Sequence, residues 1–131
     1  MYDFRKVCDV ANYLAQVKRE EYIRSAISRY YYSLFGCARL YLILIMHEFE
    51  FERGSNVHTR VCDRLKYSDN PTEHSLGKRL EKLRELRNLA DYDWEKKDRH
   101  FFHDNIGYIK DETQIGLEQI NSLKNSPPYR I

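Results

Sequence analysis

The chain has 131 residues, a length that suits one domain whose hydrophobic core needs no disulfide bonds. Its 22 basic and 20 acidic side chains leave a net charge of +2, which argues against a protein that holds nucleic acid by bulk electrostatic attraction. The most apolar run, LYLILIM at 40–46, is far shorter than the roughly 20 residues that span a bilayer, and the N-terminus lacks the apolar stretch of a signal peptide. We therefore expect a cytoplasmic protein that does not contact a membrane.

Apolar side chains recur at spacings of three and four residues along most of the chain, which is typical of α-helices. The expected helices cover residues 4–17, 20–47, 57–67, 73–90 and 99–123. Ser55 or Asn56 is expected to cap the third helix, and Pro71 or Thr72 to open the fourth. The pattern predicts an all-α, up-and-down bundle of four to five helices. One domain is expected over residues 1–124, followed by an extended or disordered tail at 125–131.

Three consecutive tyrosines lie inside the second expected helix, where each residue turns the side chain by about 100°. Tyr30 falls on the stripe that faces the core, Tyr31 falls at its edge, and Tyr32 points outward as a contact residue. A second face of this helix carries Ser33 and Gly36, whose small side chains allow another helix or another subunit to approach closely.

Arg87 is a charged residue in the middle of the apolar stripe of the fourth expected helix. It lies about 20° from Leu76 around the helix axis, where a charge is costly unless it is paired or faces an interface. Asp91, one turn further on, is placed to pair with it, and Arg84 lies at the edge of the stripe. Two interpretations stay open: a structural ion pair, or an arginine that faces a cleft or subunit interface and binds an anion such as phosphate.

These segments resemble the HEPN domain (higher eukaryotes and prokaryotes nucleotide-binding), and in particular its small single-domain prokaryotic branch. The resemblance rests on two short patterns, A-x-x-R-x-Y-Y-x-x-F and R-x-x-A-D-Y, and on the order and length of the five expected helices. The matching residues are Ala26, Arg29, Tyr31, Tyr32 and Phe35 in the first pattern, then Arg87, Ala90, Asp91 and Tyr92 in the second.

The resemblance implies a homodimer, because that is the usual state of these proteins. Many members are metal-independent endoribonucleases that act as toxins or defence components beside a nucleotidyltransferase antitoxin. Their active site resembles R-x(4 to 6)-H. In that site an arginine stabilises charge on the phosphate, and a histidine moves a proton so that the ribose 2′-hydroxyl can attack.

The chain departs from that site, because no histidine follows Arg87 at the family's spacing. Tyr92 stands where the shortest spacing would place it, and a tyrosine with a pKa of about 10 is a poor base near neutral pH. His58, His100 and His103 are the candidates for a substitute that folds back toward Arg87.

The expected site therefore centres on Arg87, with Asp91, Tyr92 and Asn88 beside it on the same helix. The residues expected to support it or to contact substrate are Arg29, Arg84, His58 and Tyr32. No metal or cofactor is expected, because the acidic clusters at 48–52 and 91–98 are interpreted as solvated loop charge and the three cysteines lack zinc-site spacing.

Three functions are compatible with these residues. The first is a ribonuclease toxin with a degenerate active-site motif. The second is a non-catalytic HEPN module that binds a nucleotide, RNA or a nucleotidyltransferase partner. The third is a helical adaptor in which Arg87 and Asp91 only fix helix packing.

Overall fold

The computed structural model describes residues 2–94 and 100–127. Within these ranges the chain forms five α-helices and no strand, which confirms the predicted all-α bundle. The helices are α1 (Arg5–Gln16), α2 (Glu20–Leu40), α3 (Val57–Lys66), α4 (Pro71–Tyr92) and α5 (Phe101–Asn125). A π-helical turn, η1 (Tyr41–Ile45), continues α2, and a 3-10 helix, η2 (Phe49–Glu52), follows it. None of the described helices is both long and apolar enough to cross a bilayer.

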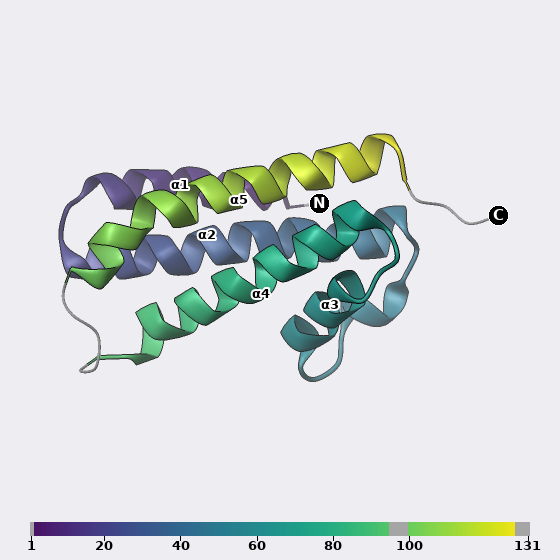
Figure 1. Cartoon of the computed structure of the whole chain (residues 1–131), viewed down its shortest axis with the longest axis horizontal. Coiled ribbons are helices and arrows are strands. Elements are labelled where there is room, and N and C mark those ends of the chain that lie inside the picture. Colours follow the sequence, from purple (N-terminus) through teal and green to yellow (C-terminus); the bar gives the residue numbers. More distant parts are fainter. Residues whose placement is uncertain (1, 95–99, 128–131) are drawn as a thin grey trace.

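Helix α2 is the centre of the bundle, because α1, α4 and α5 all pack against it. Figure 1 shows α1 and α5 running along α2, while α4 crosses beside it at an angle and α3 lies under α4. Both α3 and η2 belong to the segment that connects the end of α2 to the start of α4. The short helix α3 packs mainly on α4 and also contacts α2, so it covers one side of both.

Local chemistry at the start of α4 agrees with the prediction, whereas that at the start of α3 does not. Pro71 is the first residue of α4, as predicted, and the side chain of Asn70 caps the helix by accepting a hydrogen bond from the backbone N–H of Glu73 at 2.9 Å. The predicted side-chain cap of α3 is wrong. Asn56 stands directly before that helix with a left-handed backbone (φ 56°), and no side chain caps the first turn.

The tyrosines of α2 are more deeply buried than expected. Tyr30 and Tyr31 are both fully buried, so the prediction that Tyr31 lies at the boundary of the core is wrong, whereas Tyr32 is 38% exposed. The small-residue face of α2 is covered by the start of the chain, not by a second subunit. The hydroxyl of Ser33 donates to the carbonyl oxygen of Phe4 at 2.9 Å, and the Phe4 ring lies directly over Gly36.

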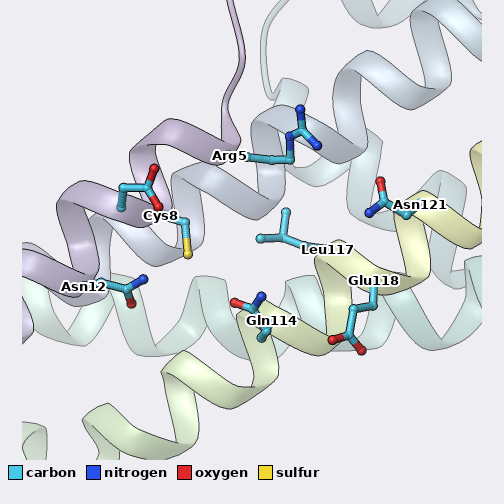
Figure 2. A pocket seen from close by; sticks show the side chains of 8 residues that line it. Arg5, Cys8, Asn12, Gln114, Leu117, Glu118 and Asn121 are labelled. Carbon is cyan, nitrogen blue, oxygen red and sulfur yellow. The ribbon is translucent and has the colours of Figure 1, made fainter.

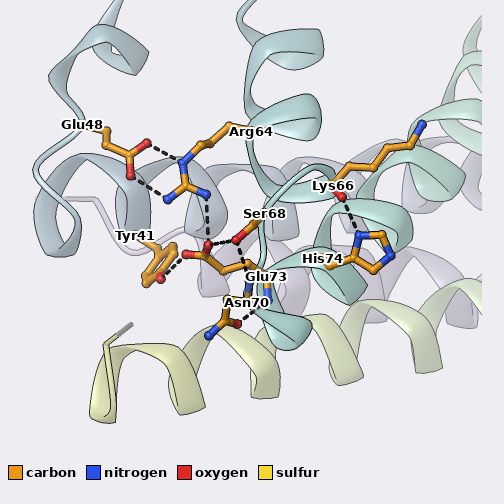
Figure 3. A network of polar contacts seen from close by, with 8 residues as sticks. All are labelled: Tyr41, Glu48, Arg64, Lys66, Ser68, Asn70, Glu73 and His74. Carbon is orange, nitrogen blue, oxygen red and sulfur yellow. Dashed lines mark hydrogen bonds and ion pairs between the residues drawn. The ribbon is translucent and has the colours of Figure 1, made fainter. Parts of the chain in front are cut away.

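A buried carboxylate fixes the end of α2 to α3 and α4 (Figure 3). The Glu73 carboxylate, 2% exposed, accepts hydrogen bonds from the hydroxyls of Tyr41 and Ser68 at 2.6 Å each, and from Nη1 of Arg64 at 3.0 Å. The same guanidinium is paired with both carboxylate oxygens of Glu48, at 2.6 and 2.7 Å. Every charge in this network has an opposite partner, so it orders the connection between α2 and α4.

Candidate functional site

The guanidinium of Arg87 lies buried against two tyrosine rings of α2. Its Cζ atom is 5.1 Å from the centre of the Tyr31 ring and 5.2 Å from that of Tyr32, and the side chain is 9% exposed. Its Nη1 atom is 3.7 Å from Oδ2 of Asp91, which is an ion pair but too long for a good hydrogen bond. Its Nε atom is buried and has no hydrogen-bond partner among the described residues. A buried cation with an unpaired donor is costly, so this position needs an explanation.

Side chains donate hydrogen bonds to the backbone carbonyl oxygens at the end of α4. Nη1 of Arg24 on α2 donates to the carbonyl oxygens of Ala90 and Asp93, at 2.9 and 2.8 Å. The indole N–H of Trp94 donates to the carbonyl oxygen of Asp91 at 3.1 Å, and Trp94 is 79% exposed. These contacts fix the turn that carries the Asp91 carboxylate beside Arg87.

His58 reaches this site from α3. Its Nδ1 atom lies 2.9 Å from the hydroxyl of Tyr31, and its ring stacks on Phe35 with the ring centres 4.1 Å apart. The His58 ring also lies 5.7 Å from the Tyr31 ring and 5.9 Å from the Tyr32 ring, the two rings that contact Arg87. Of the three histidines considered as substitutes, His58 is therefore the one that this structure brings to the tyrosine pair.

The pKa of His58 is lowered by burial and by the nearby positive charges of Arg87, Arg84 and Arg39. The imidazole is therefore neutral near neutral pH. A neutral imidazole has one nitrogen that donates a hydrogen bond and one that accepts, so His58 adds a hydrogen-bonding group to the site without adding a fourth cation.

Arg84 is another of the cations near His58. Its Nη1 atom donates to the hydroxyl of Thr59 at 2.9 Å, and its Nε atom is buried without a hydrogen-bond partner among the described residues. Within the described part of the chain, Arg84 and Arg87 are the residues whose buried side-chain nitrogens lack such a partner. Both lie on α4 three residues apart, so their positive potential adds on one side of this helix.

The remaining predicted residues do not join this cluster directly. Asn88, Tyr92 and Arg29 are exposed, and among the described contacts none of them makes a hydrogen bond or ion pair with Arg87. His103 lies in the first turn of α5, and His100 stands directly before that helix. In the described ranges, no group of three histidine, cysteine or acidic side chains is placed to hold a metal ion.

The position of His58, which α3 brings against the tyrosines of α2, is what sequence reasoning described least well. The one signal was the spacing of four residues between Tyr31 and Phe35, which places two aromatic rings on the same side of α2. That spacing predicts an aromatic surface on α2, but it does not say which segment covers it. The structure shows that the first turn of α3 does so, with the His58 ring on Phe35.

A separate surface cavity of about 230 Å³ lies between α1 and α5. Figure 2 shows the carboxamides of Asn12, Gln114 and Asn121 around it, with Cys8 at its side. Burial raises the pKa of the Cys8 thiol, so this cysteine is a poor nucleophile near neutral pH. Because its cysteine is not activated, this cavity is not the candidate active site.

No family model, curated protein or solved structure matches the chain. The HEPN assignment therefore stays a prediction, based on two short sequence patterns and on the order of the helices.

Proposed function

We propose that this chain is an HEPN-like protein that binds single-stranded RNA through a phosphate at Arg87. The observation that carries the proposal is the guanidinium of Arg87, with Arg84 one turn away on α4. Within the described residues the two Nη atoms of Arg87 have no hydrogen-bond partner and are not among the buried unpaired nitrogens, so a ligand can reach them. An anion is the ligand that such donors lack, and the planar fork of arginine suits phosphate oxygens.

Exposed aromatic rings beside Arg87 favour RNA over a free anion. Tyr32, 38% exposed, packs on the Arg87 guanidinium, and Trp94, 79% exposed, contacts the backbone of Asp91, the ion-pair partner of Arg87. Unpaired bases stack on such rings, whereas bases inside a duplex are not available to them. The net charge of +2 implies modest affinity that depends on these local contacts.

Cleavage of the bound RNA is the second candidate function, and the position of His58 favours it. Arg87 and His58 lie against the same two tyrosine rings, so a phosphate at Arg87 would have an arginine and a histidine nearby. Metal-independent cleavage needs these two types of side chain, one to stabilise charge and one to move a proton. A toxin acting as a homodimer beside a nucleotidyltransferase antitoxin is the context that the HEPN resemblance implies.

The single tryptophan provides the test. Trp94 is the only tryptophan of the chain, and its backbone contact is to Asp91, the partner of Arg87, so its fluorescence should report on a ligand at this site. The full chain is titrated with a short single-stranded RNA and with a hairpin duplex of the same composition. The test compares the wild type with Arg87→Met. This substitution removes the guanidinium but fills the buried position with an apolar side chain of similar length.

We expect the single strand to bind more tightly than the hairpin, and Arg87→Met to lower the affinity about tenfold or more. The matched control is Lys82→Met, which removes an exposed cation about 140° away around α4 and should change affinity little. Equal binding by Arg87→Met and the wild type would contradict the proposal. Electrophoresis of the same RNA after incubation separates binding from cleavage.

A further inference from the structure

The contact between Tyr31 and His58 restricts where the proton of His58 lies. The Tyr31 side chain is fully buried, and within the described residues its hydroxyl is bonded to Nδ1 of His58 and to no other polar atom. Burial raises the pKa of Tyr31, so the phenol keeps its proton. That buried O–H needs an acceptor, and Nδ1 can accept only if it carries no proton of its own.

The opposite arrangement is unfavourable. If Nδ1–H donated to the phenol oxygen, the phenol O–H would remain buried without an acceptor. A neutral imidazole holds one N–H, so with Nδ1 as acceptor that proton is on Nε2. The Nε2 atom has no hydrogen-bond partner among the described residues, and it is not one of their buried unpaired nitrogens, so it is open to a ligand.

We propose that Tyr31 is a positioning residue that holds His58 as an Nε2–H donor, and that this N–H is a second contact to the phosphate bound by Arg87. The inference rests on the proposed function, because it names a further group that contacts the same ligand. It differs from a motif histidine in two ways: His58 comes from α3 and not from α4, and it meets the ligand as an N–H donor. This form of His58 serves the binding function and not the base step of the cleavage named as the second candidate.

The charges around His58 give the contact a pH dependence. The groups that face its ring are Tyr31, Tyr32 and Arg39 from α2, with Arg84 and Arg87 from α4. Burial and these three arginines oppose protonation of His58, and so does the buried Tyr31 hydroxyl, which needs Nδ1 as its acceptor. A bound phosphate would offset the repulsion of the arginines. Phosphate binding should therefore raise the pKa of His58, and RNA affinity should increase as the pH falls below neutrality.

The first test measures the tautomer without RNA. In the full chain labelled with ¹⁵N-histidine, NMR distinguishes protonated from unprotonated ring nitrogens, and the His58→Asn variant identifies the His58 signals among the five histidines. We expect Nδ1 of His58 to be unprotonated and Nε2 to be protonated in the wild type. Tyr31→Phe, which removes only the hydroxyl, should shift the equilibrium toward Nδ1–H. Protonation of Nδ1 in the wild type would overturn the inference.

The second test measures RNA affinity through Trp94 with two replacements of His58. A glutamine side chain can place an amide N–H near the position of Nε2, whereas an asparagine side chain reaches only the position of Nδ1. We expect His58→Asn to weaken binding of a single-stranded RNA by about threefold to tenfold, with His58→Gln retaining most of the affinity. The wild-type affinity should also rise on acidification, and His58→Asn should remove this rise.

The outcomes separate this inference from the proposed function. If His58→Asn and Tyr31→Phe bind RNA as the wild type does while Arg87→Met does not, the phosphate contact of His58 is overturned and the proposed function stands. If the wild type binds no RNA, the proposed function and the phosphate contact fail together. The tautomer in the free protein then still decides whether Tyr31 positions His58.

Discussion

The hydroxyl of Tyr31 and Nδ1 of His58 lie 2.9 Å apart, and this contact joins the centre of α2 to the first turn of α3. It depends on a neutral His58, because an imidazolium has no acceptor for the phenol proton. The pKa of His58 is below its ordinary value of 6.5 as a result of burial and of Arg87, Arg84 and Arg39. The unfolded chain therefore takes up a proton at His58 at a higher pH than the folded chain does.

The free energy of unfolding should consequently decrease as the pH falls from about 6.5 through the lower folded-state pKa of His58, and this contribution should be fully present above about pH 6.5. Urea denaturation of the wild type and of His58→Asn between about pH 7.5 and 5 measures it. The wild type should lose more stability than the variant over this range. If the free energy of unfolding depends on pH in the same way for the wild type and for His58→Asn, then His58 has the same pKa in the folded and the unfolded chain.

Replacing Arg87 by methionine should leave the free energy of unfolding unchanged or raise it by about 1 kcal/mol. The reason is that a buried guanidinium with an unpaired Nε and a 3.7 Å ion pair does not recover its full desolvation cost. The partner variant Asp91→Asn should instead destabilise the fold by about 1–3 kcal/mol, because it leaves the Arg87 charge buried without its counter-ion. Urea denaturation of both variants provides the comparison. A loss of several kcal/mol in Arg87→Met would favour the structural ion-pair interpretation.

Glu73→Gln should destabilise the fold by about 3–5 kcal/mol, because it removes the negative charge from a buried network and leaves Arg64 with one counter-ion fewer. Thermal and urea denaturation measure the loss. The matched control is Glu81→Gln, whose carboxylate is 44% exposed and paired with Lys66, and which should change stability little. Similar effects of the two substitutions would contradict the structural role of the network.

Gly77→Ala should weaken the packing of α3 on α4. A Cβ atom at Gly77 would lie 2.3 Å from the backbone nitrogen of Lys66 and 2.7 Å from its Cα, so the helices would have to separate. We expect a loss of about 1–3 kcal/mol in the free energy of unfolding. Gly107→Ala is the control within α5, because no atom lies within 4 Å of the added Cβ, and it should stabilise the chain by about 0.5–1 kcal/mol. Equal effects of Gly77→Ala and Gly107→Ala on the free energy of unfolding would show that α3 leaves room for a side chain at Gly77.

Helical periodicity was sufficient to predict the bundle and the position of Arg87 on the buried face of α4, since both depend on spacing within one helix. It failed for Tyr31, which lies at the edge of its own helical stripe but is covered by His58 from another helix. The path that brings α3 there runs through a π turn and two left-handed residues, His47 and Asn56. Such local geometry has no periodic signature, so the association of His58 with Arg87 required the structure.

Arg24 has a consequence for engineering. Its guanidinium occupies the carbonyl oxygens of Ala90 and Asp93 from a neighbouring helix, so the last turn of α4 is completed by a residue far away in the sequence. A synthetic peptide of 71–94, or the same segment grafted onto a foreign scaffold, would contain Arg87 and Asp91 but would lack the hydrogen bonds from Arg24. Transplanting the site would require α2 and α4 to be moved together.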